Sequence, residues 1–139
     1  MREILFKGKS LLSGEWVEGY LVRHPSAIQI GDDYSPWYIH VPPTDPDDSG
    51  GVFNVDPSTV CEWTGLTDCK GRKIWEGDKI TGLFLHGQSV TATVGFRDGS
   101  FGAKWHRGVT LEFSPFTSVC NVEWEVIGNI HDEEGGQHV

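Results

Sequence analysis

Two carboxylates come closest to a catalytic or metal-binding pattern in this sequence. Glu76 and Asp78 flank Gly77, and His106 or His131 could join them from elsewhere in the chain. Paired carboxylates can bind a divalent cation or transfer a proton in acid–base catalysis. However, the pattern lacks a third fixed ligand and a nucleophile, and Glu-Gly-Asp is also typical of a turn that enters a strand. We therefore favour a structural role and predict no catalytic, metal-binding or cofactor-binding residue. A metal-dependent enzyme that uses this turn is the alternative.

Other metal-ligating residue types are present but scattered. Zinc sites usually show close pairs such as Cys-x-x-Cys or His-x₃₋₅-His. Neither pair occurs here, so we expect ordinary histidines and reduced, structural thiols. The residues concerned are His24, His40, His86, His106, His131 and His138, with Cys61, Cys69 and Cys120.

A basic centre in an acidic chain offers a second kind of chemistry, which is binding. The net charge is −9, yet residues 68–107 hold seven bases against four acids. Small barrels bind single-stranded nucleic acid with bases interleaved among aromatic residues. The acidic remainder argues against general affinity for nucleic acid, and the acidic segments could instead neutralise the basic centre within the fold. The candidate interaction face comprises Lys70, Arg72, Lys73, Trp75, Lys79, Lys104 and Trp105.

Short strands must position these residues. Eighteen glycines and seven prolines indicate many turns, and no segment shows a convincing helical pattern. Alternating or apolar runs predict strands at residues 3–7, 14–22, 27–30, 37–41, 52–55, 89–96, 101–105, 110–113 and 122–130, and Asp98-Gly99 predicts a hairpin turn. The last of these runs places Val126, Gly128 and Ile130 on the inner side, while Ile127 breaks the outward polarity. The prediction is a mainly β fold, either a small barrel or a sandwich of short antiparallel strands with little helix.

The most patterned stretch is T-G-L-T-D-C-K-G-R-K-I-W-E-G-D-K-I, residues 64–80. We interpret it as turns around a short strand rather than a ligand cradle. Gly65 supplies a tight turn, Asp68 caps a turn that Gly71 closes, and Glu76 to Asp78 form the next turn. The residues assigned a structural role are Gly65, Asp68, Gly71, Glu76, Gly77, Asp78, Asp98, Gly99 and Gly128.

The expected organisation is one compact unit with four parts. An N-terminal β section spans residues 1–63 and contains a mobile acidic loop at 42–51. A double-turn connector at 64–80 leads to a C-terminal β-hairpin barrel section at 81–131 and a flexible tail at 132–139. The sequence contains no apolar run of about 18 residues and no signal-peptide block, so we expect a cytoplasmic protein without membrane contact.

Several blocks together resemble the YopX family of phage and prophage proteins. They are M-R-E-I-L-F-K-G-K, G-E-W-V-E-G-Y-L-V, V-D-P-S-T-V, the W-T-G-L-T-D-C-K-G-R-K-I-W-E-G-D-K-I block, V-G-F-R-D-G-S-F-G and W-E-V-I-G-N-I-H, in family order. Lys70 and Trp75 stand where the family usually has Asn and Tyr, and the loop at 42–51 is longer and more acidic. The resemblance implies a small, mostly β, phage-encoded protein in the bacterial cytoplasm. It implies no activity and no catalytic residue.

The favoured function is therefore a non-enzymatic protein-interaction or accessory module. Its partner would be a host or phage protein, or another copy of the chain in a homo-oligomer. The first alternative is a small nucleic-acid-binding barrel, although nucleic acid is the less favoured partner. The second alternative is the metal-dependent enzyme described above.

Overall fold

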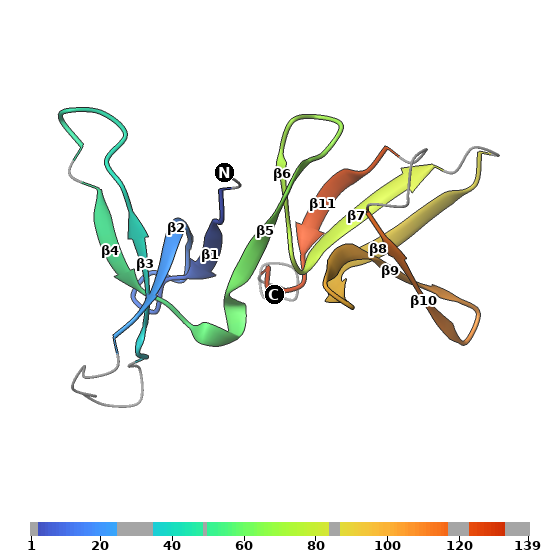
Figure 1. Cartoon of the computed structure of the whole chain (residues 1–139), viewed down its shortest axis with the longest axis horizontal. Helices are drawn as coiled ribbons and strands as arrows, with labels where there is room; N and C mark the ends of the chain where they lie inside the picture. The colour runs from blue at the N-terminus through green and yellow to red at the C-terminus, as the bar shows by residue number, and fades with distance from the viewer. Residues whose placement is uncertain (1–2, 25–34, 49, 84–86, 117–122, 133–139) are drawn as a thin grey trace, which may run out of the picture. The chain divides into compact units, whose positions relative to one another are not determined.

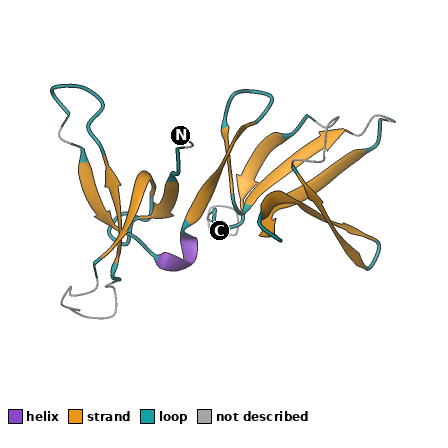
Figure 2. Cartoon of the chain, in the orientation of Figure 1, coloured by secondary structure: helices purple, strands orange, loops and turns teal. Residues whose placement is uncertain are grey.

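The computed structural model describes residues 3–24, 35–48, 50–83, 87–116 and 123–132, which are almost entirely strand and turn (Figures 1 and 2). The helical element among them is one 3-10 turn, η1 (Pro57–Thr59). Asp56 caps this turn by accepting the Ser58 N–H at 3.0 Å. The predicted strand at 27–30 lies outside the described residues, as do His86, His138 and Cys120.

The first sheet holds six strands in the order β4-β3-β2-β1-β5-β6. The pairs β1–β2, β1–β5, β2–β3 and β3–β4 are antiparallel. The strands are β1 (Phe6–Lys9), β2 (Trp16–Arg23), β3 (Trp37–Val41), β4 (Gly51–Asn54), β5 (Cys61–Thr67) and β6 (Lys73–Trp75).

The second sheet holds five antiparallel strands in the order β10-β9-β8-β7-β11. They are β7 (Asp78–Leu83), β8 (Ser89–Arg97), β9 (Ser100–Arg107), β10 (Thr110–Pro115) and β11 (Glu125–Asn129). The prediction of a mainly β, antiparallel fold is confirmed. Both sheets are open, so the closed barrel among the expected architectures does not form.

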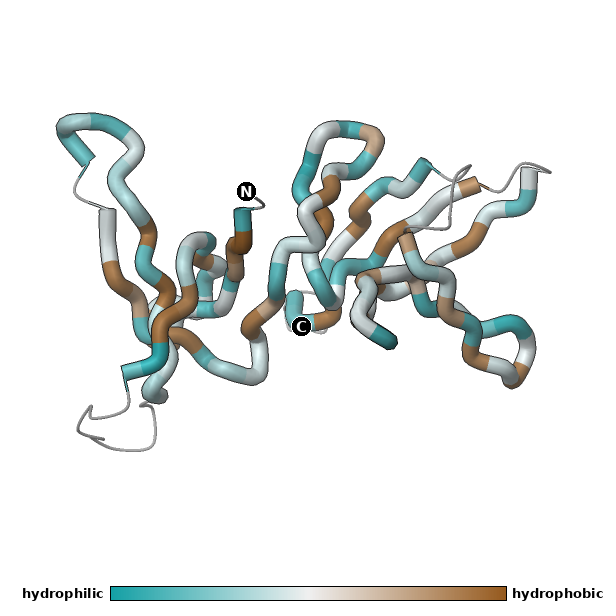
Figure 3. Tube along the Cα trace, viewed as in Figure 1, coloured by the Kyte–Doolittle hydropathy of each residue, from teal (hydrophilic) through white to brown (hydrophobic). Residues whose placement is uncertain are grey.

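The chain divides into two compact units, Met1–Trp63 and Thr64–Val139, and the boundary falls inside β5. In the first unit Ile39, Val55 and Cys61 are buried. In the second unit the core lies on one face of the five-stranded sheet, and Trp105 and Val126 pack against it. Its buried members are Ile74, Ile80, Ala92, Val94, Ala103 and Trp124. Figure 3 shows the hydrophobic and hydrophilic stretches that alternate along the chain of each unit.

Two local predictions about turns have different outcomes. Asp98 and Gly99 both have positive φ, at 52° and 81°, as a two-residue hairpin turn requires. Gly65 also has positive φ, at 88°, but it lies within β5 rather than in a tight turn. The Thr64 hydroxyl accepts the Leu66 N–H at 3.2 Å and donates to the Ile74 carbonyl at 2.8 Å. This bridging hydroxyl keeps the strand paired across Gly65, so the predicted turn is wrong.

The end of β11 differs from its predicted alternation because of a β-bulge. Val126 pairs with Ile80 and Gly128 pairs with Lys79, so Ile127 is an extra residue in the ladder. Ile127 is 55% exposed and Ile130 is 50% exposed, whereas Asn129 is buried. The expectation that Gly128 and Ile130 point inward is therefore wrong, since the extra residue reverses which side chains face the core.

The acidic loop between β3 and β4 is organised by its own carboxylates. Asp48 accepts the Gly50 N–H at 2.8 Å and the Thr44 N–H at 3.0 Å. These backbone hydrogen bonds, together with one from the Thr44 hydroxyl, hold the pKa of the Asp48 carboxyl below its ordinary value.

Candidate interaction surface

Asp68 ties the turn of the β5–β6 hairpin to β11. Its Oδ1 accepts the N–H groups of Lys70 at 2.9 Å and Arg72 at 2.8 Å, and its Oδ2 accepts the Val126 N–H at 2.9 Å. Burial alone would raise the pKa of this carboxyl. The three N–H donors and the nearby Arg72 charge outweigh burial and lower the pKa instead. The predicted capping role of Asp68 is therefore present, with a longer-range contact added to it.

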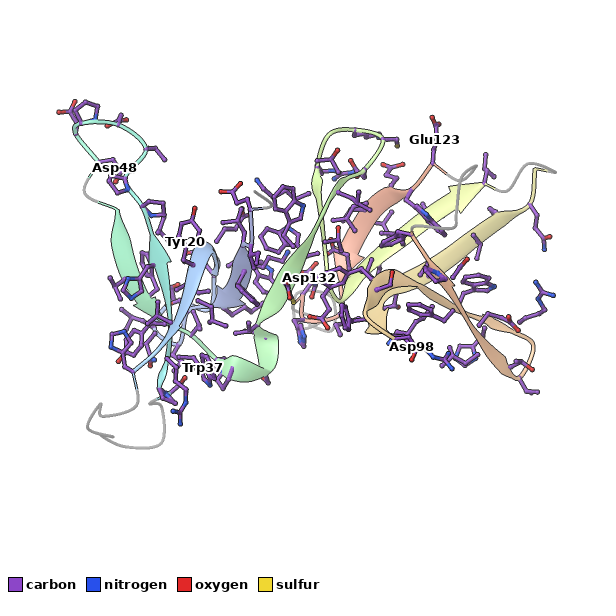
Figure 4. All side chains as sticks on the ribbon, viewed as in Figure 1. Tyr20, Trp37, Asp48, Asp98, Glu123 and Asp132 are labelled. Carbon is purple, nitrogen blue, oxygen red and sulfur yellow. The ribbon has the colours of Figure 1, made fainter. Side chains whose placement is uncertain are left out.

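Asp78 is a second internal clamp. It is 1% exposed, its Oδ2 accepts the Trp75 N–H at 2.7 Å, and its Oδ1 accepts the Asn129 side-chain amide at 2.9 Å. Asn129 in turn accepts the His131 N–H at 2.8 Å. Asp132, labelled in Figure 4, accepts the Asn129 N–H at 2.9 Å. One polar network thus joins the start of β7 to the end of β11.

These contacts decide how the acids of the central motif can be used. Both carboxylate oxygens of Asp78 accept hydrogen bonds from protein donors, so this carboxylate acts as an internal acceptor of the fold. Gly77 bonds through its backbone to Val94 at 2.8 Å and to Ile130 at 2.9 Å, which fixes this turn against neighbouring strands. Across the described ranges, no group of three His, Cys, Asp or Glu side chains is placed to hold a metal ion.

The predicted interaction face is brought together only in part. Lys79 on β7, Thr93 on β8 and Lys104 on β9 lie opposite one another in the ladder, so their side chains share one face. Ile80 and Ala92 belong to the core, so this shared face is the outer one. Arg97, four residues after Thr93 on β8, lies on the same face. Sequence reasoning missed Arg97, although its period-2 spacing from Thr93 could have identified it.

The two tryptophans of the predicted face do not lie on it. Trp75 is 4% exposed, and Trp105 packs against the core on the opposite side of β9 from Lys104. Strand alternation places Trp105 on the core side of β9, whereas Lys73 and Trp75 lie in β6, outside the five-stranded sheet.

A pair of glycines shapes the middle of the outer face. Gly95 and Gly102 lie opposite each other, and a Cβ at Gly95 would approach the Lys104 Cε at 2.7 Å. A Cβ at Gly102 would approach the Phe113 ring at 2.6 Å. The Lys104 stem and the Phe113 ring therefore lie over bare backbone. The Arg97 guanidinium stands 5.9 Å from the centre of the Phe113 ring, close enough for a cation–π contact.

Lys70 and Arg72 reach the edge of the same face through Glu125. The Lys70 Nζ lies 2.9 Å from the Glu125 carboxylate, and the Arg72 guanidinium lies 3.4 Å from it. The hydrogen bond and charge of Glu125 raise the pKa of Lys70. Glu125 pairs with Thr81 in the ladder, which places it on the outer face. We use the term basic face for Lys79, Arg97 and Lys104 with Lys70 and Arg72 at its β11 edge.

Comparison with known proteins shows a family to which this sequence belongs. Residues 26–134 match the family described as YopX protein. The chain belongs to the YopX family. The match includes the central motif and Asn129, so the polar clamps of the second unit lie in the part of this YopX protein that the family shares. The predicted family assignment is confirmed.

The fold of this YopX protein is also found in a solved structure. It is similar to the crystal structure of protein EF1440 from Enterococcus faecalis, with a TM-score of 0.52 over 95% of this chain and 96% of that chain. The two sequences are 17% identical, so the likeness concerns the fold alone. Comparison with curated proteins gives no match. No helix in the described part of the YopX chain is long and apolar enough to cross a membrane.

Proposed function

We propose that this YopX protein is a non-enzymatic interaction module that binds an acidic partner protein through the basic face. Its expected setting is the cytoplasm of a bacterial host cell, with a host or phage protein as the partner. The observation that carries the proposal is the cross-strand row of Lys79, Thr93 and Lys104 on the outer face of the second sheet.

Charge on this face differs in sign from the charge of the whole chain. Glu125 is the one acidic residue among the described residues that strand register places on the outer face. It is already paired with Lys70 and Arg72. Lys104 and Arg97 are exposed. A local excess of positive charge on a chain of net charge −9 attracts an acidic partner in one orientation, because the rest of the chain repels it.

The position of the tryptophans favours a protein partner over single-stranded nucleic acid. Single strands are bound by stacking bases on exposed aromatic rings that alternate with basic side chains. Trp75 and Trp105 are on the core side of their strands. The ring of Phe113 on the outer face is already in contact with Arg97. The basic face therefore offers charge and hydroxyl groups without a free stacking platform.

Charge reversal on the face tests the proposal. Tagged wild-type chain and the Lys79→Glu/Lys104→Glu variant would be purified from host cells, and the co-purifying proteins would be quantified by mass spectrometry. We expect an acidic partner to be recovered with the wild type and lost with the variant. The matched control is Arg107→Glu. Arg107 is an exposed residue of β9 that pairs with Thr110, and strand alternation places it on the opposite face of the sheet from Lys104.

Two results would contradict this function. Recovery of the same partner with the double variant would show that binding uses another surface. Binding of labelled single- or double-stranded oligonucleotides at low salt, lost on charge reversal, would support the nucleic-acid alternative instead.

A further inference from the structure

Strand β4 presents an open backbone edge in the first unit. It is the outermost strand beside β3, as Figure 1 shows. The Val55 N–H bonds to the Trp37 carbonyl at 3.1 Å, so alternate residues of this segment bond to β3. The backbone N–H and carbonyl of Phe53 therefore point toward β3, whereas those of Val52 point outward, away from the sheet. Further along, the Asn54 carbonyl accepts the Leu11 N–H at 2.9 Å, which covers that end of the edge.

The side chains of β4 do not protect this edge. Natural edge strands usually carry a lysine, a proline or a bulge that prevents another strand from pairing with them. The sequence of β4 is Gly-Val-Phe-Asn, without a charge or a proline. Val52 is 57% exposed and Phe53 is 38% exposed. Among the described residues the edge is thus apolar and exposed, and the outward backbone groups of Val52 can pair with a further strand.

Two hollows adjoin β4, and Val52 lines both of them. A cavity of about 360 Å³ is lined by Leu11, Leu12 and Phe53 among others. A second cavity, of about 270 Å³, is lined by Tyr20, His40 and Val52 among others. Tyr20, His40 and Val52 form one row across β2, β3 and β4 (Tyr20 is labelled in Figure 4). An added strand beside β4 would place its side chains against these two hollows.

His40 supplies a polar group beside the second hollow. Its Nε2 is buried and has no hydrogen-bond partner in the described structure. A buried imidazole nitrogen without a partner loses stability that an incoming hydroxyl or amide can restore.

The charges around β4 define what can bind. Asp45, Asp47 and Asp48 precede the strand, and Asp56 follows it. Asp47 is exposed, and the two lysines of β1, Lys7 and Lys9, lie over the Trp16 ring. An uncharged edge with acids at both ends complements an apolar strand with bases at both ends. It opposes a second copy of β4, which would bring the same acids to the same edge.

We propose that β4 is a docking edge for an extended segment of another protein, with an alternating apolar centre and Lys or Arg at both ends. The segment would pair with β4 through the outward backbone groups of Val52 and fill the two flanking hollows. This site lies in the first unit and does not depend on the basic face of the second unit.

Capped peptides test the docking edge directly. The probe is a nonapeptide with two Lys at each end and a Val-Thr-Val-Tyr-Val centre, titrated against the full chain at low salt by fluorescence anisotropy. Its partner probe carries Glu in place of every Lys. We expect the basic peptide to bind and the acidic peptide to bind at least about tenfold more weakly. A flat titration with the basic peptide, or equal binding of the two peptides, would overturn the proposal.

Substitutions at the edge separate backbone pairing from simple charge attraction. Val52→Pro removes an outward N–H without breaking the ladder to β3, and Val52→Thr keeps that N–H. We expect peptide binding to weaken about tenfold in Val52→Pro, as the loss of a backbone hydrogen bond implies, and to stay within about twofold in Val52→Thr. Asp47→Lys should weaken binding, whereas Glu123→Lys in the second unit should not. Equal binding to Val52→Pro and wild type would overturn the proposal.

Two further measurements keep the test decisive. If Val52→Pro unfolds, as circular dichroism would show, N-methylation of alternate peptide amides removes the same hydrogen bonds on the wild-type chain. Retained binding by the N-methylated peptide would then contradict strand addition. Sedimentation of the chain alone must show no dimer that Val52→Pro abolishes, because such a dimer would identify a second copy as the occupant.

Discussion

The buried carboxylate of Asp78 accepts a 2.9 Å hydrogen bond from the side-chain amide of Asn129, 51 residues later in the chain. The same carboxylate accepts the Trp75 N–H at 2.7 Å. A residue that reads in the sequence as half of an acidic pair is therefore the point where β6, β7 and β11 are joined.

The first prediction concerns the two partners of this bond. Asp78→Ala should lower the free energy of unfolding by about 2–4 kcal/mol, because it leaves two buried donors unpaired. Asp78→Asn should also be destabilising, since its Nδ2 would face a donor. The double variant Asp78→Asn/Asn129→Asp should recover part of the loss by reversing the direction of the bond. Urea denaturation of the wild type, the single variants Asp78→Asn and Asn129→Asp, and the double variant measures this coupling, and strict additivity of the two single losses would contradict it.

The second prediction concerns acid. The pKa of Asp68 is lower in the folded chain than in the unfolded chain, so its stabilising effect is complete above about pH 4, the unfolded value. As the pH falls below 4 and toward the folded-state pKa, this contribution is lost. Asp68→Asn should therefore be less stable at pH 7 and should lose less stability between pH 5 and 3. The matched control is Asp98→Asn, whose side chain is 93% exposed and whose hairpin turn also accepts Asn. Melting temperatures across the pH range decide it, and parallel curves for wild type and Asp68→Asn would refute it.

The third prediction ranks two glycines of the central motif. Gly71 and Gly77 have φ values of 83° and 85°, so a Cβ at either position costs about 1–2 kcal/mol of backbone strain. No atom lies within 4 Å of a Cβ built at Gly71, whereas one at Gly77 would meet the Ile130 side chain at 3.3 Å. Gly77→Val should therefore lower the melting temperature more than Gly71→Val. Asn at Gly71 should be tolerated better than Val, because Asn adopts positive φ more readily. Equal losses at the two glycines would contradict the steric argument.

The fourth prediction uses the facing pair Gly95 and Gly102. A Cβ at Gly102 would come within 2.5 Å of the Ser114 carbonyl oxygen, which is backbone and cannot move without shifting β10. At Gly95 the obstacle is the Lys104 stem, which can rotate away. Gly102→Ala should therefore destabilise the chain by about 2 kcal/mol or more, and Gly95→Ala by less. Chemical denaturation of both variants tests the order, and a larger loss for Gly95→Ala would reverse the interpretation.

The fifth prediction concerns the edge of the basic face. Glu125→Gln removes the carboxylate that holds Lys70 and Arg72. These ion pairs are largely exposed, so the stability should change by less than about 1 kcal/mol. Affinity for an acidic partner should rise, because two positive charges are released. The control is Glu112→Gln, because Glu112 pairs with Trp105 and lies on the opposite face of the sheet from Glu125. Weaker partner binding in Glu125→Gln would contradict the proposed use of this face.

Local patterns predicted much of the strand content because hydrophobic alternation and turn chemistry agree there. Residues 37–41 form β3 with the predicted bounds, and Asp98-Gly99 forms the turn between β8 and β9. The prediction from the sequence misses strand β5, and the reason is physical. Gly65 has a positive φ, which usually signals a turn, but the Thr64 hydroxyl bridges to the Ile74 carbonyl of β6 and the strand continues to Thr67.

The candidate interaction face was only partly predictable, because residues that are neighbours in the sequence need not lie on the same face of a strand. Lys104 and Trp105 are adjacent, yet the period of two in a strand places them on opposite sides of β9. Trp75 sits among bases in the sequence and is buried in the structure. The interactions of Asp68 with Val126 and of Asp78 with Asn129 span more than fifty residues, so no local pattern could have paired them.

The bulge of β11 has a consequence for insertion and deletion. Without Ile127, Val126 would still face Ile80, and Gly128 and Asn129 would still face Lys79 and Asp78, because the ladder already skips that residue. Removing it should preserve the pairing of the strand, whereas removing Gly128 or Asn129 would shift the Asn129 amide away from its carboxylate. Strand β11 thus contains one position that is dispensable for register, next to one that is not.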